Sequence, residues 1–161
     1  MIIRQAKPGE RGQLFKEAYK IWNKNRTFEQ YCADNGKEDA YGTRYVLEHK
    51  GRIVSSLILL NLKELYGCKV YGFGSVLTSP AYTGNGYATK LLKYCIGEIT
   101  DENKIFFLYS EINPEFYGKL DFRVLPPHLQ KDKKAICMVL CGADMWKQLV
   151  DIPINLIPDY F

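Results

Sequence analysis

Two glycines alternate with larger residues directly in front of an amphipathic segment, at Gly84, Asn85, Gly86 and Tyr87. Glycine lets the backbone adopt positive φ angles and approach a ligand without interference from a Cβ atom. The first N–H groups of a helix have no partner inside the helix, and the helix dipole adds partial positive charge there. Such a turn is typical of a phosphate site. A purely structural strand-to-helix connection is the alternative.

Two familiar phosphate-binding motifs do not fit this turn. A Walker loop ends in Gly-Lys-Ser/Thr, whereas Gly86 is followed by Tyr87 and Ala88, which disfavours nucleotide hydrolysis. A dinucleotide-binding turn follows the first strand of a parallel sheet, whereas this turn lies mid-chain, after a predicted hairpin.

The elements that must position the turn follow from the spacing of apolar residues. We expect helices over residues 10–22, 27–36 (from Thr27 to Gly36), 88–99, 113–120 and 143–149. We expect single strands over residues 1–6, 68–78 and 104–110, and an antiparallel pair over 122–126 and 135–141. Residues 44–62 are expected to form a hairpin with its turn at Lys50 and Gly51. Gly72 and Gly74 indicate a bulge or a close approach in their strand. This order predicts an α/β (α+β) fold with a mixed, mostly antiparallel central sheet flanked by helices.

Composition limits the class of protein. The chain has 161 residues, 47% of them hydrophobic, and a net charge of +4, which predicts one globular domain and gives no argument for nucleic-acid binding. The five cysteines form neither a CxxC pair nor a metal-ligand cluster, so we expect a reducing compartment and no metal. No apolar run is long enough for a membrane span. The expected location is the cytoplasm.

The stretch TSPAYTGNGYATKLL resembles the acyl-CoA-binding motif of the GNAT superfamily of N-acetyltransferases, written Q/R-x-x-G-x-G/A and preceded by a strand ending in V-x-P. Residues 83–88 occupy the six motif positions, and residues 78–80 the strand end. The downstream NPEFYGKLDF is similar to the second hallmark, F-Y-x-x-x-G-F, through Phe116, Tyr117 and Phe122. Thr83 replaces the usual Gln or Arg, and Asp121 replaces the glycine before Phe122. Asp tolerates turn conformations, so the second change alters a turn.

The resemblance implies a single GNAT-like acetyltransferase domain over residues 1–161. It implies an acetyl-CoA-dependent N-acetyltransferase that transfers an acetyl group directly to a primary amine in a ternary complex. A non-catalytic GNAT-fold module that binds an acyl-CoA or a peptide is the alternative, and a longer acyl chain stays open. The residues that the resemblance assigns to acetyl-CoA or coenzyme A are Val76, Leu77, Thr78, Thr83, Gly84, Asn85, Gly86, Tyr87, Ala88, Thr89 and Asn113.

Catalytic residues are also expected from the resemblance. By resemblance, Tyr117 is the general acid that protonates the leaving thiolate, with a packing aromatic as the alternative. The resemblance does not indicate the base. Glu111, just after the strand at 104–110, is preferred over Glu64, in the loop after the hairpin, because it is near Tyr117 in sequence, although a solvated carboxylate is the favoured explanation for each. Asn113 has a second explanation as a helix cap. The acceptor would be a small-molecule amine or a protein amino group, and a homodimer stays open.

Other side chains that could do chemistry have simpler explanations. His49 and His128 fit no catalytic triad, so we expect exposed structural roles for both. Aromatic residues between 22 and 45 could line an acceptor pocket, but core packing explains at least half of them: Trp22, Phe28, Tyr31, Tyr41 and Tyr45.

Overall fold

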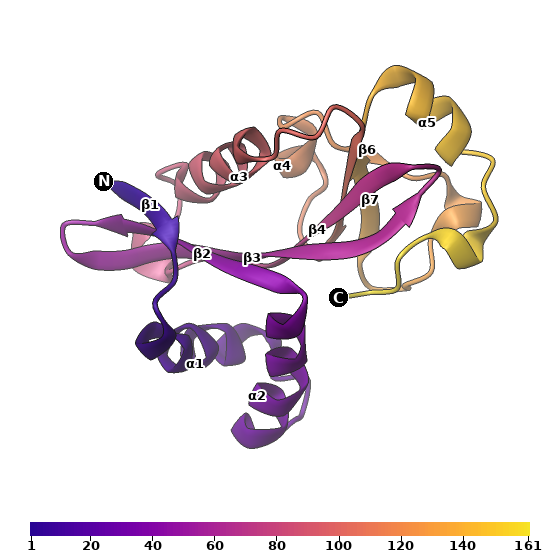
Figure 1. The fold of residues 1–161 in the computed structure, drawn as a ribbon. Helices are drawn as coiled ribbons and strands as arrows, with labels where there is room; N and C mark the ends of the chain where they lie inside the picture. Colours follow the sequence, from indigo (N-terminus) through magenta and orange to yellow (C-terminus); the bar gives the residue numbers. More distant parts are fainter. The chain divides into compact units, whose positions relative to one another are not determined.

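The computed structural model describes residues 1–161 and contains one sheet of seven strands in the order β1-β2-β3-β4-β5-β7-β6 (Figure 1). The strands are Ile2–Gln5 (β1), Gly42–His49 (β2), Arg52–Leu65 (β3), Cys68–Thr78 (β4), Lys104–Ser110 (β5), Arg123–Val124 (β6) and Ile136–Leu140 (β7). The α-helices are Arg11–Trp22 (α1), Phe28–Gly36 (α2), Tyr87–Glu98 (α3), Glu115–Gly118 (α4) and Ala143–Leu149 (α5). The expected mixed, mostly antiparallel sheet flanked by helices is confirmed.

Contacts along the chain define two compact units. The first comprises Met1–Leu60 and Ser75–Ile99, and the second Asn61–Gly74 and Thr100–Phe161. The single domain over residues 1–161 stays a prediction. None of the helices is both long enough and apolar enough to cross a membrane.

In the first unit, β1 pairs with β2 and β2 with β3, both antiparallel. The turn between β2 and β3 places Lys50 at φ 50° and Gly51 at φ 72°, the positive angles of a tight hairpin turn, as predicted. Arg4 on β1 donates hydrogen bonds to Glu10 and Glu48 and joins the helix entry to the sheet. The bond from Arg4 lowers the pKa of Glu10 to about 2.

The helices α1 and α2 lie on one face of the β1–β2–β3 region, and α3 lies on the other (Figure 1). Thr27 caps α2 as predicted, because its hydroxyl accepts the N–H of Gln30 at 3.2 Å. The α-helix ends at Gly36, as predicted, and a 3-10 helix follows directly over Lys37–Ala40. Ile21, near the end of α1, is 54% exposed although it is apolar. The small core beneath these helices comprises Phe15, Ala18, Tyr31 and Leu77.

In the second unit, β5 runs parallel to β4 and antiparallel to β7, which also pairs with β6. The predicted strand at 122–126 is only the two residues of β6. The N–H of Leu125 still donates to the carbonyl of Cys137 on β7, but the Gln130 side chain bonds to the Leu125 carbonyl and the Cys137 N–H, and the two prolines that follow lack an N–H to donate. A close approach does occur at Gly72, but the group that approaches is a side chain rather than the backbone or ligand expected, since a Cβ there would lie 2.7 Å from the Phe161 ring. The core of this unit is built on β5 and β7, with Ile105, Phe107, Cys137 and Val139.

Candidate active site

The turn between β4 and α3 has an unusual backbone. Its two glycines take the left-handed conformation, with φ of 80° at Gly84 and 70° at Gly86, and glycine adopts these angles without steric strain. A Cβ added at either position would meet no heavy atom within 4 Å. Residues 83–86 are all exposed. The glycines therefore serve the backbone conformation and leave open space above it, as a ligand-binding turn requires.

Side chains of the turn hold its shape. The Asn85 amide donates to the carbonyl oxygens of Tyr82 at 3.0 Å and Thr83 at 3.3 Å. The Thr83 hydroxyl donates to the carbonyl of Pro80 at 3.0 Å. Thr83, which replaces the Gln or Arg of the motif, thus donates its hydroxyl hydrogen bond within the turn.

The start of α3 is uncapped by any side chain. Gly86 occupies the N-cap position without a side-chain hydrogen bond, and the N–H of Lys90 is the donor to its carbonyl, at 3.0 Å. The N–H groups of Tyr87, Ala88 and Thr89 precede that bond and have no acceptor within the helix. No acidic residue lies in the first turn. The geometry fits a pyrophosphate, since free N–H donors and the dipole favour an anion there.

The end of β4 is irregular, as expected for this strand, but the irregularity lies at Ser75 rather than at a glycine. Ser75 has a φ of 48°, the left-handed conformation inside a strand. The β4–β5 ladder ends at Phe73 and Leu108, although both strands continue. Past Ser75, the carbonyl of Leu77 accepts the Ser55 hydroxyl at 2.8 Å.

Tyr117 lies on α4 in the second unit. It is 7% exposed and packs against Phe116 and Phe122 with ring centroids 4.9 and 6.2 Å away. Burial raises the pKa of its hydroxyl to about 12. No group of the second unit forms a hydrogen bond with this hydroxyl. Tyr117 is therefore protonated at neutral pH and has a proton to donate, and its catalytic role stays a prediction.

The other predicted residues of the second unit have identified partners. Glu111 is exposed after β5 and accepts a hydrogen bond from the Tyr160 hydroxyl at 2.6 Å. Asn113 accepts the N–H of Glu115 at 3.0 Å, so it does cap the start of α4. Glu64 was expected in a loop but lies in β3, where it pairs with Lys69. The roles of Glu111 in catalysis and Asn113 in cofactor binding stay predictions.

The histidines differ from each other. His128 is exposed, as expected, and its Nε2 lies 2.9 Å from the carbonyl oxygen of Val150. His49 is half-buried rather than exposed, because its ring packs beside Tyr87 with centroids 5.7 Å apart. Its Nδ1 is buried without a hydrogen-bond partner.

Of the aromatic residues proposed for an acceptor pocket, Tyr31 is a core residue, 1% exposed, with Trp22 and Phe28 packed against it. Tyr41 is 41% exposed. Tyr45 packs against Tyr94 on α3. Core packing is thus the correct explanation for Trp22, Phe28 and Tyr31.

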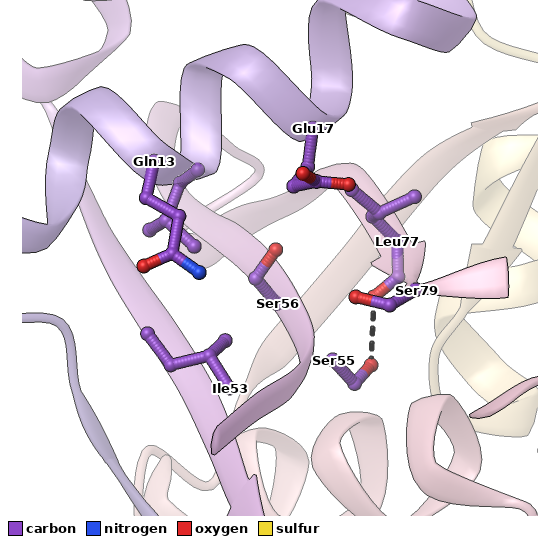
Figure 2. A pocket seen from close by; sticks show the side chains of 8 residues that line it. Gln13, Glu17, Ile53, Ser55, Ser56, Leu77 and Ser79 are labelled. Carbon is purple, nitrogen blue, oxygen red and sulfur yellow. Dashed lines mark hydrogen bonds between the residues drawn. The ribbon is translucent and has the colours of Figure 1, made fainter. Parts of the chain in front are cut away.

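A pocket in the first unit was missed from the sequence. Figure 2 shows it between α1 and the strands β3 and β4, with a volume of about 140 Å³. Gln13 and Glu17 face it from the helix, and Ser56 and Ser79 from the sheet side. The two adjacent serines within the apolar run of β3 were a visible signal, but helix residues far away in sequence complete the pocket.

The sequence was compared with models of protein families and with curated proteins. The family model described as "Acetyltransferase (GNAT) domain" matches residues 3–125. A comparison with curated protein sequences found no match.

Solved structures share the fold. An aminoglycoside 6'-acetyltransferase type Ii is 18% identical with a TM-score of 0.67, over 88% of this chain and 97% of that one. A GNAT family acetyltransferase from Brucella melitensis in complex with acetyl-CoA is 17% identical with a TM-score of 0.62, over 88% of each chain.

A protein from Enterococcus faecalis V583 described as a probable N-acyltransferase is 16% identical, with a TM-score of 0.65 over 76% of this chain. The present chain spans about a third, 32%, of the length of that protein. At these identities the likeness shows the fold alone. The match of the family model over most of the chain shows more: this chain belongs to the GNAT acetyltransferase family.

Proposed function

We propose that this protein is an N-acetyltransferase that transfers an acetyl group from acetyl-CoA to a primary amine, directly and within a ternary complex. The observation that carries the proposal is the uncapped start of α3, preceded by Gly84 and Gly86 at positive φ. Membership in the GNAT family supports it. In this proposal the turn and the first N–H groups of α3 bind the pyrophosphate of coenzyme A, with Thr83, Asn85, Tyr87, Ala88 and Thr89 around it.

The end of β4 would bind the reactive part of acetyl-CoA. Beyond the positive φ of Ser75, residues 76–78 present backbone groups along the path proposed for the pantetheine arm. An N–H there would donate to the acetyl carbonyl oxygen and stabilise the negative charge that develops on it. The hydrogen bonds of Ser55 to Leu77 and Thr78 support this role, because they hold the strand end rigid.

The reaction makes one bond and breaks one. The neutral amine attacks the thioester carbon, a C–N bond forms, and the tetrahedral intermediate expels the thiolate of coenzyme A. The amine nitrogen loses a proton to a base, for which Glu111 is the candidate, and the thiolate gains a proton from Tyr117. The pKa of Tyr117, about 12, keeps this proton on the hydroxyl at neutral pH. A thiol has a pKa of about 8.5, so the tyrosinate left after the transfer is the stronger base and regains a proton from solvent.

Release of free thiol from acetyl-CoA with a panel of primary amines tests the activity. We expect Tyr117→Phe to lower kcat by about 100-fold, the usual size of a general-acid contribution, with the KM for acetyl-CoA nearly unchanged. Tyr71→Phe is the matched control, since burial also raises the Tyr71 pKa to about 12 but its hydroxyl is bound to Asp101. A Tyr117→Phe variant with the kcat of the wild type would contradict the general-acid role.

Cofactor binding is measured separately. A saturating ligand that binds only the native state, at about 100 times its Kd, stabilises it by about 2.7 kcal/mol, which raises the Tm of a chain of this size by about 5 °C or more. If coenzyme A does not raise the Tm, the pyrophosphate role of the α3 turn is wrong. Binding without turnover on any amine would instead favour a non-catalytic acyl-CoA-binding module, the function to which the short Thr83 side chain also points.

A further inference from the structure

The pocket between α1 and the strands β3 and β4 contains polar groups with no partner. Ser56 is only 8% exposed, yet its hydroxyl forms no hydrogen bond in the protein. Ser79 precedes a 3-10 helix without capping it, and Gln13, an exposed residue of α1, lines the same space. Figure 2 shows these groups facing one space. These groups are not bonded to other side chains and line one space, so they are available to hydrogen-bond with a polar occupant.

Ser55 provides the contrast within the same strand. Its hydroxyl donates to the carbonyl of Leu77 at 2.8 Å and lies 3.1 Å from the Thr78 hydroxyl. The hydrogen-bonding capacity of the Ser55 hydroxyl is thus used within the protein, where it joins β3 to the end of β4. The hydroxyl of Ser56, one residue further along, forms no such bond between strands.

Charge selects the kind of occupant. Glu17 is the ionisable residue that lines the pocket, and its partner is Lys20 at 2.8 Å, one turn along the helix. The Lys20 side chain is 66% exposed, and exposed pairs of this kind hold a carboxylate only weakly. A carboxylate, two hydroxyls and an amide oxygen can all accept hydrogen bonds. An ammonium group has a positive charge and three donors, so it can bind the carboxylate and two of the other acceptors at once.

Size restricts the group further. A volume of about 140 Å³ holds a group of roughly four to five water molecules in size, since one water occupies about 30 Å³ in the liquid. The end of an aminoalkyl arm fits this volume. Leu77, which lines the pocket, belongs to the stretch of β4 proposed to bind the acetyl group.

The ammonium held here is not the group that reacts. A neighbouring carboxylate favours the charged form of an amine and raises its pKa, whereas attack on the thioester requires the neutral form. We propose that the pocket binds a second, protonated amino group of the acceptor, so that the acceptor is a diamine or a larger polyamine. This inference rests on the proposed acetyltransferase function. Glu17 is then a specificity-determining residue that positions the acceptor and takes no part in the chemistry.

Direct binding is the first test. Isothermal titration calorimetry of α,ω-diamines from propane-1,3-diamine to octane-1,8-diamine is carried out on the free protein and on the protein saturated with coenzyme A. We expect at least one diamine to bind more tightly than the α,ω-diol of equal length, which has no ammonium group, and Glu17→Gln to weaken that binding by about tenfold or more, because a charge-assisted hydrogen bond is lost.

Two variants serve as controls. Glu29→Gln removes the same charge from an exposed position in the first turn of α2, and the diamine should bind to it as to the wild type. Lys20→Gln frees the Glu17 carboxylate from its ion pair, so diamine binding should be retained or tighter. A merely structural Glu17 would predict the opposite, because loss of either partner of the ion pair would then have the same effect.

Turnover is the second test. The kcat/KM for the best diamine should exceed that for the monoamine of equal length by about tenfold in the wild type, and the ratio should fall toward one in Glu17→Gln. Equal kcat/KM values in the wild type, or a preference that survives Glu17→Gln, would overturn the inference.

The two proposals fail in different ways. If acetyl-CoA is neither bound nor cleaved, the acetyltransferase function is wrong, and the calorimetry on the free protein still decides about the pocket. Glu17-dependent binding of a diamine then supports an amine site. Absence of binding across the diamine series overturns it, whether or not acetyl-CoA is cleaved.

Discussion

Replacement of Gly86 by alanine separates the role of this glycine in folding from its role in binding. Gly86 has a φ of 70°, and a Cβ there would meet nothing within 4 Å. The stability loss therefore comes from the left-handed backbone alone and should be about 1 to 2 kcal/mol. The loss in coenzyme A affinity should be larger, because the Cβ would project into the open space above the turn and displace the pyrophosphate from the N–H groups of α3. Each charge-assisted hydrogen bond lost costs about 1.5 to 3 kcal/mol, a factor of about 10 or more in Kd.

The matched control is Gly67→Ala, in the hairpin between β3 and β4. Gly67 has a φ of 75° and equally open surroundings, so its replacement should cost the same stability. Thermal unfolding measures the first loss, and a chain of this size loses about 2 to 4 °C in Tm per kcal/mol. Calorimetric titration with coenzyme A measures the second. Two variants that lose equal stability and bind coenzyme A equally well would refute the pyrophosphate role of the turn.

Three further predictions concern Tyr117, Asp121 and the cooperativity of the chain. Because burial raises the pKa of Tyr117 to about 12, kcat in thiol-release assays should not fall between pH 8 and 10; a decline there would exclude this tyrosine as the acid. Its unfolded pKa is about 10, so its contribution to stability is present below pH 10 and is lost as the pH rises toward 12, which pH-dependent denaturation would detect. Asp121 has a φ of 66°, so Asp121→Val should be less stable than Asp121→Gly by about 1 kcal/mol or more in urea denaturation; equal midpoints would show that the backbone there is not strained. Finally, a single domain predicts one calorimetric unfolding transition across residues 1–161, and two resolved transitions would contradict it.

Local patterns predicted most of the secondary structure. The strands over 68–78 and 104–110 have the predicted bounds, since a run of branched and aromatic residues between turn residues leaves little choice. The hairpin turn at Lys50 and Gly51 was also predicted correctly. The errors lie where tertiary contacts overrule local preference. The strand predicted at 122–126, for example, is only the two residues of β6.

In the candidate site, too, local features could be predicted from the sequence and features that depend on other parts of the chain could not. The glycine turn and Tyr117 could be found from the sequence because each is defined by neighbours within a few residues. The irregularity of β4 was predicted, but at the wrong residue, since Ser75 rather than a glycine takes the positive φ. The ordinary side chains of Thr83 and Asn85 gave no sign that they would brace the turn through backbone carbonyls.

By itself, the sequence determined the order of the elements and the uncapped, glycine-led start of α3, because backbone conformation there depends on residue type alone. Only the tertiary structure decided which polar groups are left without partners. Ser55 and Ser56 are identical and adjacent, but one hydroxyl is bonded to β4 and the other faces the pocket beneath Glu17. The reason is that the acceptor of Ser55, the carbonyl of Leu77, is 22 residues away in sequence, and only the folded chain brings the two within 2.8 Å.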